Sequence, residues 1–245
     1  MSKKIVVLGS SNTDMIIKVA RIPKPGETVL GGEFSTAAGG KGANQAVAAA
    51  RAGGKVVFIG RVGDDMFGEQ AVSGFVCDGI DVNYVIRDAE APSGVALIFV
   101  DANGENSIAV ASGANARVSP SDVAAAREVI ASSALLLMQL EIPLATVSAA
   151  AEIAASHGVE VILNPAPAQP LDKSLLGHIS TLTPNETEAE LLTGCRVVDE
   201  RSANEAAGIL HGRGVRNVLI TLGARGVFAA THEFTGIIPA YRVDN

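Results

Sequence analysis

The amino-acid sequence predicts an α/β fold, a doubly wound and mostly parallel sheet flanked by helices, with a small β-sheet lid. Short apolar runs typical of strands alternate with helical stretches along the 245 residues, which favours parallel strands joined by right-handed crossovers. The strand runs are apolar throughout, as in residues 135–140 (LLLMQL), and strands covered on both faces have this pattern. Residues 95–110 break the alternation, and Asn103-Gly104 within them suits the tight turn of a hairpin.

In the first half of the chain, glycine and capping signals bound the predicted elements. An alanine-rich helix ends where Gly53 provides a natural stop. Ser119 and Asp122 have capping-box spacing with Pro120 at the first helical position, so a helix follows to about residue 131. The predicted elements are, in order, strand 5–9, helix 44–52, strand 56–60, helix 67–77 and helix 120–131.

In the second half, the alternation of apolar runs and helical stretches is regular. Four runs are predicted as parallel strands, and residues 218–222 are the last of them. The elements are, in order, strand 135–140, helix 144–156, strand 159–163, strand 179–182, helix 185–192, helix 200–211 and strand 218–222.

Two segments are expected to form the lid, inserted as residues 14–38 and 92–112 into a single α/β domain of residues 1–245. Residues 14–38 include PKPGETVLGGEF, which is extended and rich in turn formers. Residues 95–100 are apolar on both faces of the predicted strand, so both faces need a cover. We therefore expect one face of the lid to lie over a ligand and the other to contact a second subunit.

Composition excludes several classes of protein. Hydrophobic residues make up 48% and charged residues 18% of the chain, as in globular domains. The net charge of −7, without a basic block, argues against a nucleic-acid partner. No apolar run approaches the roughly 18 residues of a membrane helix, and residues 5–8 are too short for a signal-peptide core. Cys77 and Cys195 lie far apart without metal-type spacing, which favours free thiols in a cytoplasmic protein.

Polar residues follow the predicted strands at their carboxyl ends, where open α/β sheets bind ligands. Asn12 and Asp14 follow the first strand, Glu141 follows residues 135–140, and Asn164 follows residues 159–163. Each residue alone is explained as a turn former, but their repetition along one sheet edge predicts a site. Glu141 leaves an apolar strand, so its carboxylate needs a partner, either a ligand hydroxyl or a backbone N–H.

The stretch TPNETE, which follows residues 179–182, has two interpretations. Thr183 and Glu186 are expected to form a capping box with Pro184 at the first helical position. Asn185 and Glu188 then share one helix face, where an amide and a carboxylate suit hydrated Mg²⁺ and a nucleotide phosphate. Exposed helical glutamates are common, so an ordinary solvated face explains Glu188 equally.

Two glycine-rich stretches are candidates for binding a phosphate or a nucleotide. In TLGARG, residues 221–226, the glycines either bring the backbone close to a nucleotide or form a hairpin turn. The segment AAGGKGANQA fails the P-loop pattern, because Gly42 follows Lys41 where Ser or Thr is needed. It also fails the dinucleotide-binding pattern, since it does not follow the first strand directly.

A series of motifs in this order resembles the ribokinase (PfkB) family of carbohydrate and nucleoside kinases. The glycine motif GGKGANQA, followed by Gly53 and Gly63, is similar to the first signature of that family. The other motifs extend over the chain from end to end: GSSNTD, PKPGET, GRVGDDMFGE, MQLE, NPAPA, TPNETEAE and TLGARG.

The resemblance implies a ribokinase-like fold and ATP-dependent phosphorylation of D-ribose at its 5-hydroxymethyl oxygen. It also implies Mg²⁺, a monovalent cation such as K⁺, and a homodimer formed through the lid. Glu188 would organise Mg²⁺ through water. ATP would contact Asn185, Thr221, Leu222, Gly223, Ala224, Arg225 and Gly226. The sugar would contact Asn12, Thr13, Asp14, Gly40, Lys41, Gly42, Ala43, Asn44 and Glu141.

The resemblance does not extend to the second signature of the family. That motif, a glycine-rich helix start with the catalytic aspartate and the anion hole, would follow Asn245. We therefore expect no catalytic residue among the 245 and a sequence that lacks the C-terminal part of the family. Two alternatives stay open: a related kinase for deoxyribose or a nucleoside, and a non-catalytic sugar-binding protein.

Overall fold

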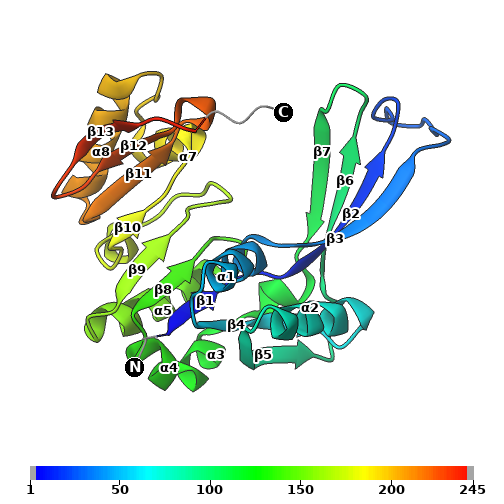
Figure 1. The fold of residues 1–245 in the computed structure, drawn as a ribbon, viewed down its shortest axis with the longest axis horizontal. Coiled ribbons are helices and arrows are strands. Elements are labelled where there is room, and N and C mark those ends of the chain that lie inside the picture. The colour runs from blue at the N-terminus through cyan, green and yellow to red at the C-terminus, as the bar shows by residue number, and fades with distance from the viewer. Residues whose placement is uncertain (1–3, 242–245) are drawn as a thin grey trace. The chain divides into compact units, whose positions relative to one another are not determined.

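The computed structural model of the chain describes residues 4–241, and these residues form two compact units (Figure 1). The N-terminal unit comprises residues 7–122 and 141–143. The C-terminal unit comprises the described residues 4–6, 123–140 and 144–241. Strand β1 (Ile5–Leu8) is divided between them, because its first two residues belong to one unit and its last two to the other.

The N-terminal unit contains a buried parallel pair of strands covered by helices. Strand β4 (Val56–Gly63) pairs in parallel with β5 (Asp81–Asp88). Helix α2 (Met66–Cys77) packs on β4 through Phe75 and Phe58, whose ring centroids lie 4.7 Å apart. Helix α1 (Lys41–Arg51) also contacts β4. This packing explains why residues 56–59 are apolar throughout, since every one of them is buried.

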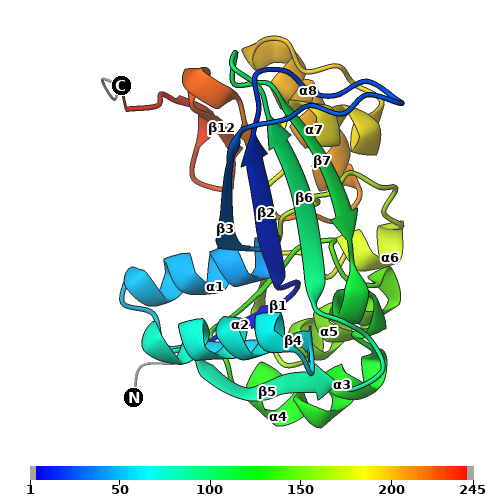
Figure 2. The same ribbon diagram turned by 90° about the vertical axis from the view of Figure 1, so that its right-hand side faces the viewer.

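The same unit carries a second sheet, which Figure 2 shows face-on. Its strand order is β3 (Glu33–Gly39), β2 (Asn12–Lys18), β6 (Gly94–Val100) and β7 (Asn106–Ala111). Strands β2 and β6 are parallel, and the other two pairs are antiparallel. The β6–β7 hairpin turns at Gly104, with φ +82, as Asn103-Gly104 predicts.

Both faces of this small sheet carry exposed apolar side chains. Paired residues of neighbouring strands share a face, so Ile108 lies on one face and Leu97 on the other. Ile108 is 53% exposed and Leu97 is 49% exposed. Phe34, on the face of Leu97, is 66% exposed. Contacts among the described residues therefore leave apolar side chains exposed on both faces of the small sheet.

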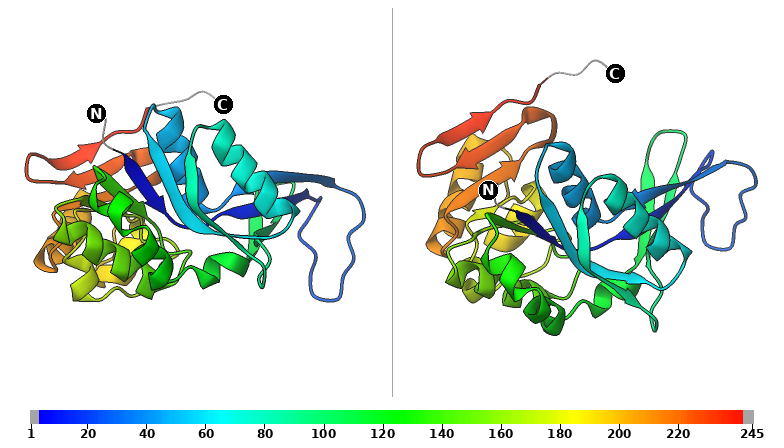
Figure 3. Two further views of the ribbon diagram at one scale, coloured as in Figure 1. Left: turned by 90° about the horizontal axis from the view of Figure 1, so that it is seen from below. Right: turned by 60° about the horizontal axis from the view of Figure 1, so that its bottom comes forward.

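The C-terminal unit is built on four parallel strands, followed by an antiparallel extension. Strands β8 (Leu135–Met138), β9 (Glu160–Leu163), β10 (Thr181–Leu182) and β11 (Asn217–Thr221) are parallel. The orange-to-red strands of Figure 3, β12 (Val227–Ala230) and β13 (Thr235–Ile238), continue the sheet in antiparallel order. The helices are α4 (Arg127–Ala131), α5 (Leu144–Ser156), α6 (Lys173–Leu176), α7 (Glu186–Thr193) and α8 (Glu200–Gly212).

Helix α5 illustrates how this unit is packed. Its buried face consists of small residues and one valine, Thr146, Val147, Ala150, Ala151 and Ala154. Small side chains let the helix approach the strands closely, and α5 contacts both β8 and β9. Within residues 4–241, none of the helices has the length and apolar character needed to cross a membrane.

The predicted fold class, a mostly parallel sheet with flanking helices and a small sheet, is confirmed. Several boundaries were wrong. The helix expected over 120–131 is two helices, α3 (Pro120–Ala125) and α4, because Ala126 leaves helical geometry at φ −96, ψ 8. Helix α1 begins at Lys41 rather than residue 44. Strands β5, β12 and β13 were not predicted.

Candidate functional site

The glycines of GGKG form the start of helix α1 against the end of β1. Gly40 is the N-cap residue and has φ +88, a conformation that L side chains rarely adopt. A Cβ on Gly40 would lie 2.8 Å from the Asn12 nitrogen, and one on Gly42 would lie 2.5 Å from the Ser10 nitrogen. The Ala43 N–H donates to the Ser10 carbonyl at 2.8 Å. The space that these glycines leave is therefore filled by the chain's own residues 9–12.

Glu141 is held at this helix start by two donors. Its Oε2 accepts hydrogen bonds from Ser10 Oγ at 2.5 Å and from the Lys41 N–H at 2.9 Å. Ser10 is completely buried. The N-terminus of a helix favours a carboxylate, so the position suits Glu141. Of the two partners expected for this carboxylate, the protein supplies a backbone N–H, and no described residue donates to its Oε1.

Asp14 lies on β2 and has no such support. A side chain on Gly39 would overlap the Asp14 carboxyl group, so the glycine leaves room for it. Burial, and then the negative charge of Glu141, raise the pKa of Asp14. In the described chain neither carboxylate has an ion-pair partner, whereas a sugar offers several hydroxyl donors to such oxygens. Asp14 and Glu141 thus form an electronegative site suited to a polyol.

Asn12 completes this site, and its support was not predicted from the sequence. It lies two residues before Asp14 on β2, so the two side chains share a face of the small sheet. Its Oδ1 accepts a hydrogen bond from Asn115 Nδ2 at 2.7 Å. Asn115 belongs to the short 3₁₀ helix η1 (Gly113–Arg117). Its only sequence signal was a polar residue among small ones in SGANAR.

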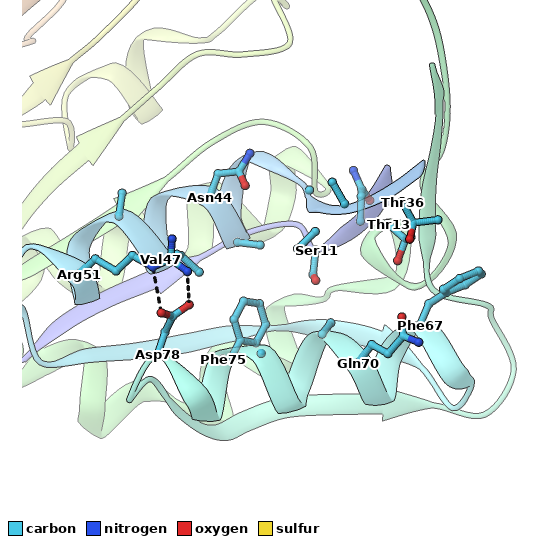
Figure 4. A pocket seen from close by; sticks show the side chains of 18 residues that line it. Ser11, Thr13, Thr36, Asn44, Val47, Arg51, Phe67, Gln70, Phe75 and Asp78 are labelled. Atoms are coloured by element: carbon cyan, nitrogen blue, oxygen red, sulfur yellow. Dashed lines mark hydrogen bonds and ion pairs between the residues drawn. The ribbon is translucent and has the colours of Figure 1, made fainter. Parts of the chain in front are cut away.

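A cavity of about 660 Å³ lies between α1, α2 and the strands β2 and β3 (Figure 4). Figure 4 shows Thr13, Thr36 and Asn44 lining it beside Phe67 and Phe75 of α2. Neighbouring residues on β2 alternate between faces, so Thr13 does not share the face of Asp14. Of the residues predicted to contact sugar, the cavity is lined by Asn12, Thr13, Ala43 and Asn44, but not by Asp14, Gly40, Lys41, Gly42 or Glu141.

In the C-terminal unit, the capping box predicted for Thr183 and Glu186 is wrong by two residues. The N-cap of α7 is Asn185, whose Oδ1 accepts from the Glu188 N–H at 2.8 Å. In return, Glu188 Oε2 accepts from the Asn185 N–H at 2.8 Å. The Thr183 N–H instead donates to the Leu163 carbonyl at 3.0 Å, which extends the pairing of β10 with β9 past Leu182.

This capping box also changes the interpretation of Glu188. The residue is only 6% exposed, so it does not belong to a solvated helix face. Capping uses one carboxylate oxygen of Glu188 and the amide oxygen of Asn185. Glu188 Oε1 and Asn185 Nδ2 have no partner among the described residues. The two side chains therefore cap the helix and still offer one oxygen and one donor to a ligand.

The TLGARG loop joins two antiparallel strands, β11 and β12, through the 3₁₀ turn η2 (Gly223–Arg225). The Leu222 N–H donates to the Gly226 carbonyl at 2.8 Å, which closes the turn. Arg225 pairs with Glu186, and it also donates to the Val198 carbonyl at 2.7 Å. The loop is thus a hairpin turn, one of the two alternatives, and its arginine is already engaged by the protein.

A protein-only metal site is not formed by the described residues. Within residues 4–241, no group of three or more His, Cys, Asp or Glu side chains is placed to hold a metal ion. Glu188 is therefore a single candidate carboxylate, which fits a cation held mainly by water and phosphate oxygens.

Comparison with known proteins extends over nearly the whole chain. The family model described as pfkB family carbohydrate kinase matches residues 2–244. The chain is 49% identical to the ribokinase of Haemophilus influenzae over 243 residues, which is 99% of this chain and 79% of that protein. It is 42% identical to the deoxyribokinase of Salmonella typhi over 241 residues, 98% of this chain and 79% of that protein. The structure of Arabidopsis thaliana ribokinase complexed with ribose and ATP matches with a TM-score of 0.87 at 32% identity, covering 97% of this chain and 78% of that one.

Proposed function

The chain belongs to the pfkB family of carbohydrate kinases, and we propose that it phosphorylates D-ribose at the 5-hydroxymethyl oxygen with ATP. The relatives named for ribose support this choice, and one of them was solved with ribose and ATP. The single observation that carries it is the site of Asp14 and Glu141, two carboxylates without an ion-pair partner among the described residues. A neutral ligand with several hydroxyl donors satisfies such oxygens without adding negative charge.

For sugar binding, Glu141 offers Oε1 and Asp14 offers its carboxylate to ribose hydroxyls. Asn12 lies on the same face of the small sheet as Asp14. The remaining sugar contacts stay predictions carried by the motif: Thr13, Gly40, Lys41, Gly42, Ala43 and Asn44.

For nucleotide binding, we assign Asn185 to the ATP phosphates and Glu188 to Mg²⁺ through water. The unpartnered Asn185 Nδ2 and Glu188 Oε1 support this assignment, since both remain after the capping box is formed. Mg²⁺ held there through water would neutralise negative charge on the ATP phosphates. The loop Thr221, Leu222, Gly223, Ala224, Arg225 and Gly226 would lie along the nucleotide. A monovalent cation and a catalytic aspartate are implied by the family resemblance alone.

We also propose a homodimer formed through the small sheet. Leu97 and Phe34 on one face, and Ile108 on the other, are each about half exposed or more. One face can close on the sugar while the other contacts a second copy of the chain. A cytoplasmic location is supported by the unpaired thiols of Cys77 and Cys195.

The test is turnover by the full-length gene product with ribose, ATP and Mg²⁺, followed as ADP release and as ribose 5-phosphate by mass spectrometry. 2-Deoxyribose and adenosine, compared by kcat/KM, are the competing substrates. The Asp64→Asn variant, which changes an exposed carboxylate (62% exposed), is the control for Asp14→Asn. A higher kcat/KM for deoxyribose or adenosine would assign the alternative kinase. Ribose binding without turnover would indicate a sugar-binding protein.

A further inference from the structure

Asn115 is a buried amide that joins η1 to the residues after β1. Only 1% of the residue is exposed. Its Oδ1 accepts from the Ser11 N–H at 2.9 Å. Its Nδ2 donates to the Ser11 carbonyl at 3.0 Å and to Asn12 Oδ1 at 2.7 Å. All three hydrogen bonds reach residues more than 100 positions away in the sequence.

These bonds fix which end of the Asn12 amide faces outward. The Ser11 N–H can only donate and its carbonyl can only accept, so the Asn115 amide has one allowed orientation. In that orientation Asn115 Nδ2 points to Asn12, so the Asn12 side chain must accept the hydrogen bond through Oδ1. The Asn12 NH₂ group is thereby turned away from Asn115, and no described residue accepts a hydrogen bond from it.

The small sheet is shaped around this amide pair. Gly94 and Gly39 are the register partners of Asn12 on its two neighbouring strands. A side chain on Gly94 would overlap both amides, and one on Gly39 would overlap the Asp14 carboxyl group. Neither glycine has a positive φ, so the backbone does not explain either one. Both positions instead keep space for Asn12 and for the carboxylate beside it.

Ion pairs hold η1, the 3₁₀ helix that carries Asn115, within the N-terminal unit. Arg117, also on η1, pairs with Asp88 at 2.8 Å and with Glu90 at 2.6 Å. Asp88 is in turn held by Arg61 at 2.9 Å. The Glu90 N–H and the two arginines lower the pKa of Asp88 to about 2, against the opposing effect of burial. The carboxylate that fixes η1 is therefore charged at neutral pH.

We propose that Asn115 is a positioning residue for sugar binding, which makes Asn12 a hydrogen-bond donor beside the acceptor Asp14. A sugar hydroxyl can donate to a carboxylate and accept from an amide at the same time. The pair Asn12 and Asp14 thus selects for a hydroxyl at one sugar position. The inference rests on the proposed function, because the ligand is the sugar of that reaction.

The test compares Asn115→Asp with the wild-type full-length gene product. The introduced carboxylate keeps an acceptor for the Ser11 N–H, but it offers oxygen to Asn12, whose amide must turn over and present its oxygen to the sugar. We expect KM for ribose to rise about 3- to 10-fold, the loss of one neutral hydrogen bond to the sugar, with little change in kcat. Asn83→Asp makes the same change at an exposed position of β5 and should match wild type.

A panel of monodeoxyriboses separates positioning from a general structural defect. In the wild type, removal of the hydroxyl that Asn12 contacts should weaken binding, and in Asn115→Asp that penalty should disappear. In the Asn12→Ala background, Asn115→Asp should raise KM no further, since both changes remove the same donor. A uniform loss for all sugars, or additive effects of the two changes, would overturn the proposal.

Asn12→Asp keeps the proposal testable where Asn115→Asp does not fold. It leaves an oxygen for Asn115 Nδ2 and all the bonds to Ser11, but it replaces the donor facing the sugar by an acceptor. An unchanged KM for ribose in this variant would refute the inference. Turnover of ribose by the wild type tests the proposed function alone. If the wild type is active and Asn12→Asp is unaffected, the proposed function stands and only the inference about Asn115 fails. If wild type neither turns over nor binds ribose by calorimetry, both are overturned.

Discussion

The N-terminal and C-terminal units hold their strand-end polar residues in different ways. In the C-terminal unit, Asn185 and Glu188 cap each other, and Arg225 pairs with Glu186. In the N-terminal unit, burial raises the pKa of Asp14, and repulsion from the Glu141 carboxylate adds to the rise. The first arrangement stabilises the fold without any ligand, while the second costs stability until something occupies it.

The difference teaches which polar residues indicate a site. Asn, Asp and Glu at strand ends were the sequence signal in both units, and in both units they also serve the fold. What separates them is the group left over after the protein's own hydrogen bonds are counted. Asp14 keeps a whole carboxylate, whereas Asn185 and Glu188 each keep one atom. The following variants test this comparison, from the largest expected effect to the smallest.

Arg61→Ala breaks the support of the N-terminal unit. Arg61 donates to Asp122 through two nitrogens at 2.8 Å and to Asp88 at 2.9 Å. The side chains of Asp122 and Asp88 are 9% and 3% exposed. The variant removes the ion pair of the buried Asp122 and leaves Asp88 with Arg117 alone. We expect a loss of about 3 kcal/mol in the free energy of unfolding, or about 6–12 °C in Tm, by denaturant and thermal unfolding.

Arg51→Ala is the matched control for that change. Arg51 pairs with Asp78 in the same unit, but its side chain is 70% exposed. Exposed ion pairs contribute about 0–1 kcal/mol, so Tm should fall by no more than about 4 °C. Equal losses for the two arginines would contradict the view that the buried cluster anchors η1.

Asp14→Asn separates binding from stability in the N-terminal site. Removing a charged acceptor should lower kcat/KM for ribose about 10- to 100-fold, as expected for hydrogen bonds to charged groups. At the same time Tm at pH 7 should rise, because the variant removes a carboxylate that the fold disfavours. Solvent screening keeps this gain to about 1–2 °C. A loss of both affinity and Tm would show that Asp14 supports the fold.

The pH dependence of the same variant follows from the direction of the shift. Burial raises the pKa of Asp14 in the folded state above the 3.8 expected for the unfolded chain. At pH values between the unfolded and the folded pKa, the folded state therefore binds more protons than the unfolded state. The contribution of this group to stability is therefore greatest at low pH and declines as pH rises through the folded pKa. The Tm difference between Asp14→Asn and wild type should shrink from pH 7 to pH 4. A Tm difference that grows toward pH 4 would show that the fold lowers the pKa of Asp14 instead of raising it.

The sequence predicted the central strands because burial on both faces leaves a clear pattern. Residues 56–59 and 135–138 are continuous apolar runs and lie in β4 and β8. Strand β5 (DVNYVIRD) mixes charged and apolar residues, since most of its residues are only partly buried. Strands β12 and β13 follow TLGARG, and the sequence left open whether that segment forms a hairpin turn. Strands β5 and β13 lie at the ends of the strand order, and edge strands give a weaker periodic signal than central ones. Strand β12 pairs on both sides and was missed because the turn before it was left open.

The candidate site could be predicted from the sequence where a strand end and a motif coincide. Asn12, Asp14 and Glu141 all follow predicted strands. The rule that ligands bind at the carboxyl ends of the strands in an open α/β sheet places them in one group. Asn115 was not predictable, because its role depends on a tertiary contact with Ser11 across more than 100 residues. The capping box was placed in the wrong register because Thr183/Glu186 and Asn185/Glu188 have identical spacing. Only the pairing of Thr183 with β9 decides between the two.

The two registers of that capping box provide the comparison with the smallest expected effect. Asn185→Ala removes the acceptor for the Glu188 N–H and should cost about 1 kcal/mol, or about 2–4 °C in Tm. Thr183→Ala removes a hydroxyl whose hydrogen bond to the Leu163 carbonyl is long, at 3.5 Å, so its cost should stay below about 0.5 kcal/mol. In ligand binding, Asn185→Ala should raise KM for ATP and leave KM for ribose unchanged, while Thr183→Ala should change neither. A larger loss of stability for Thr183→Ala would restore the register first expected from the sequence.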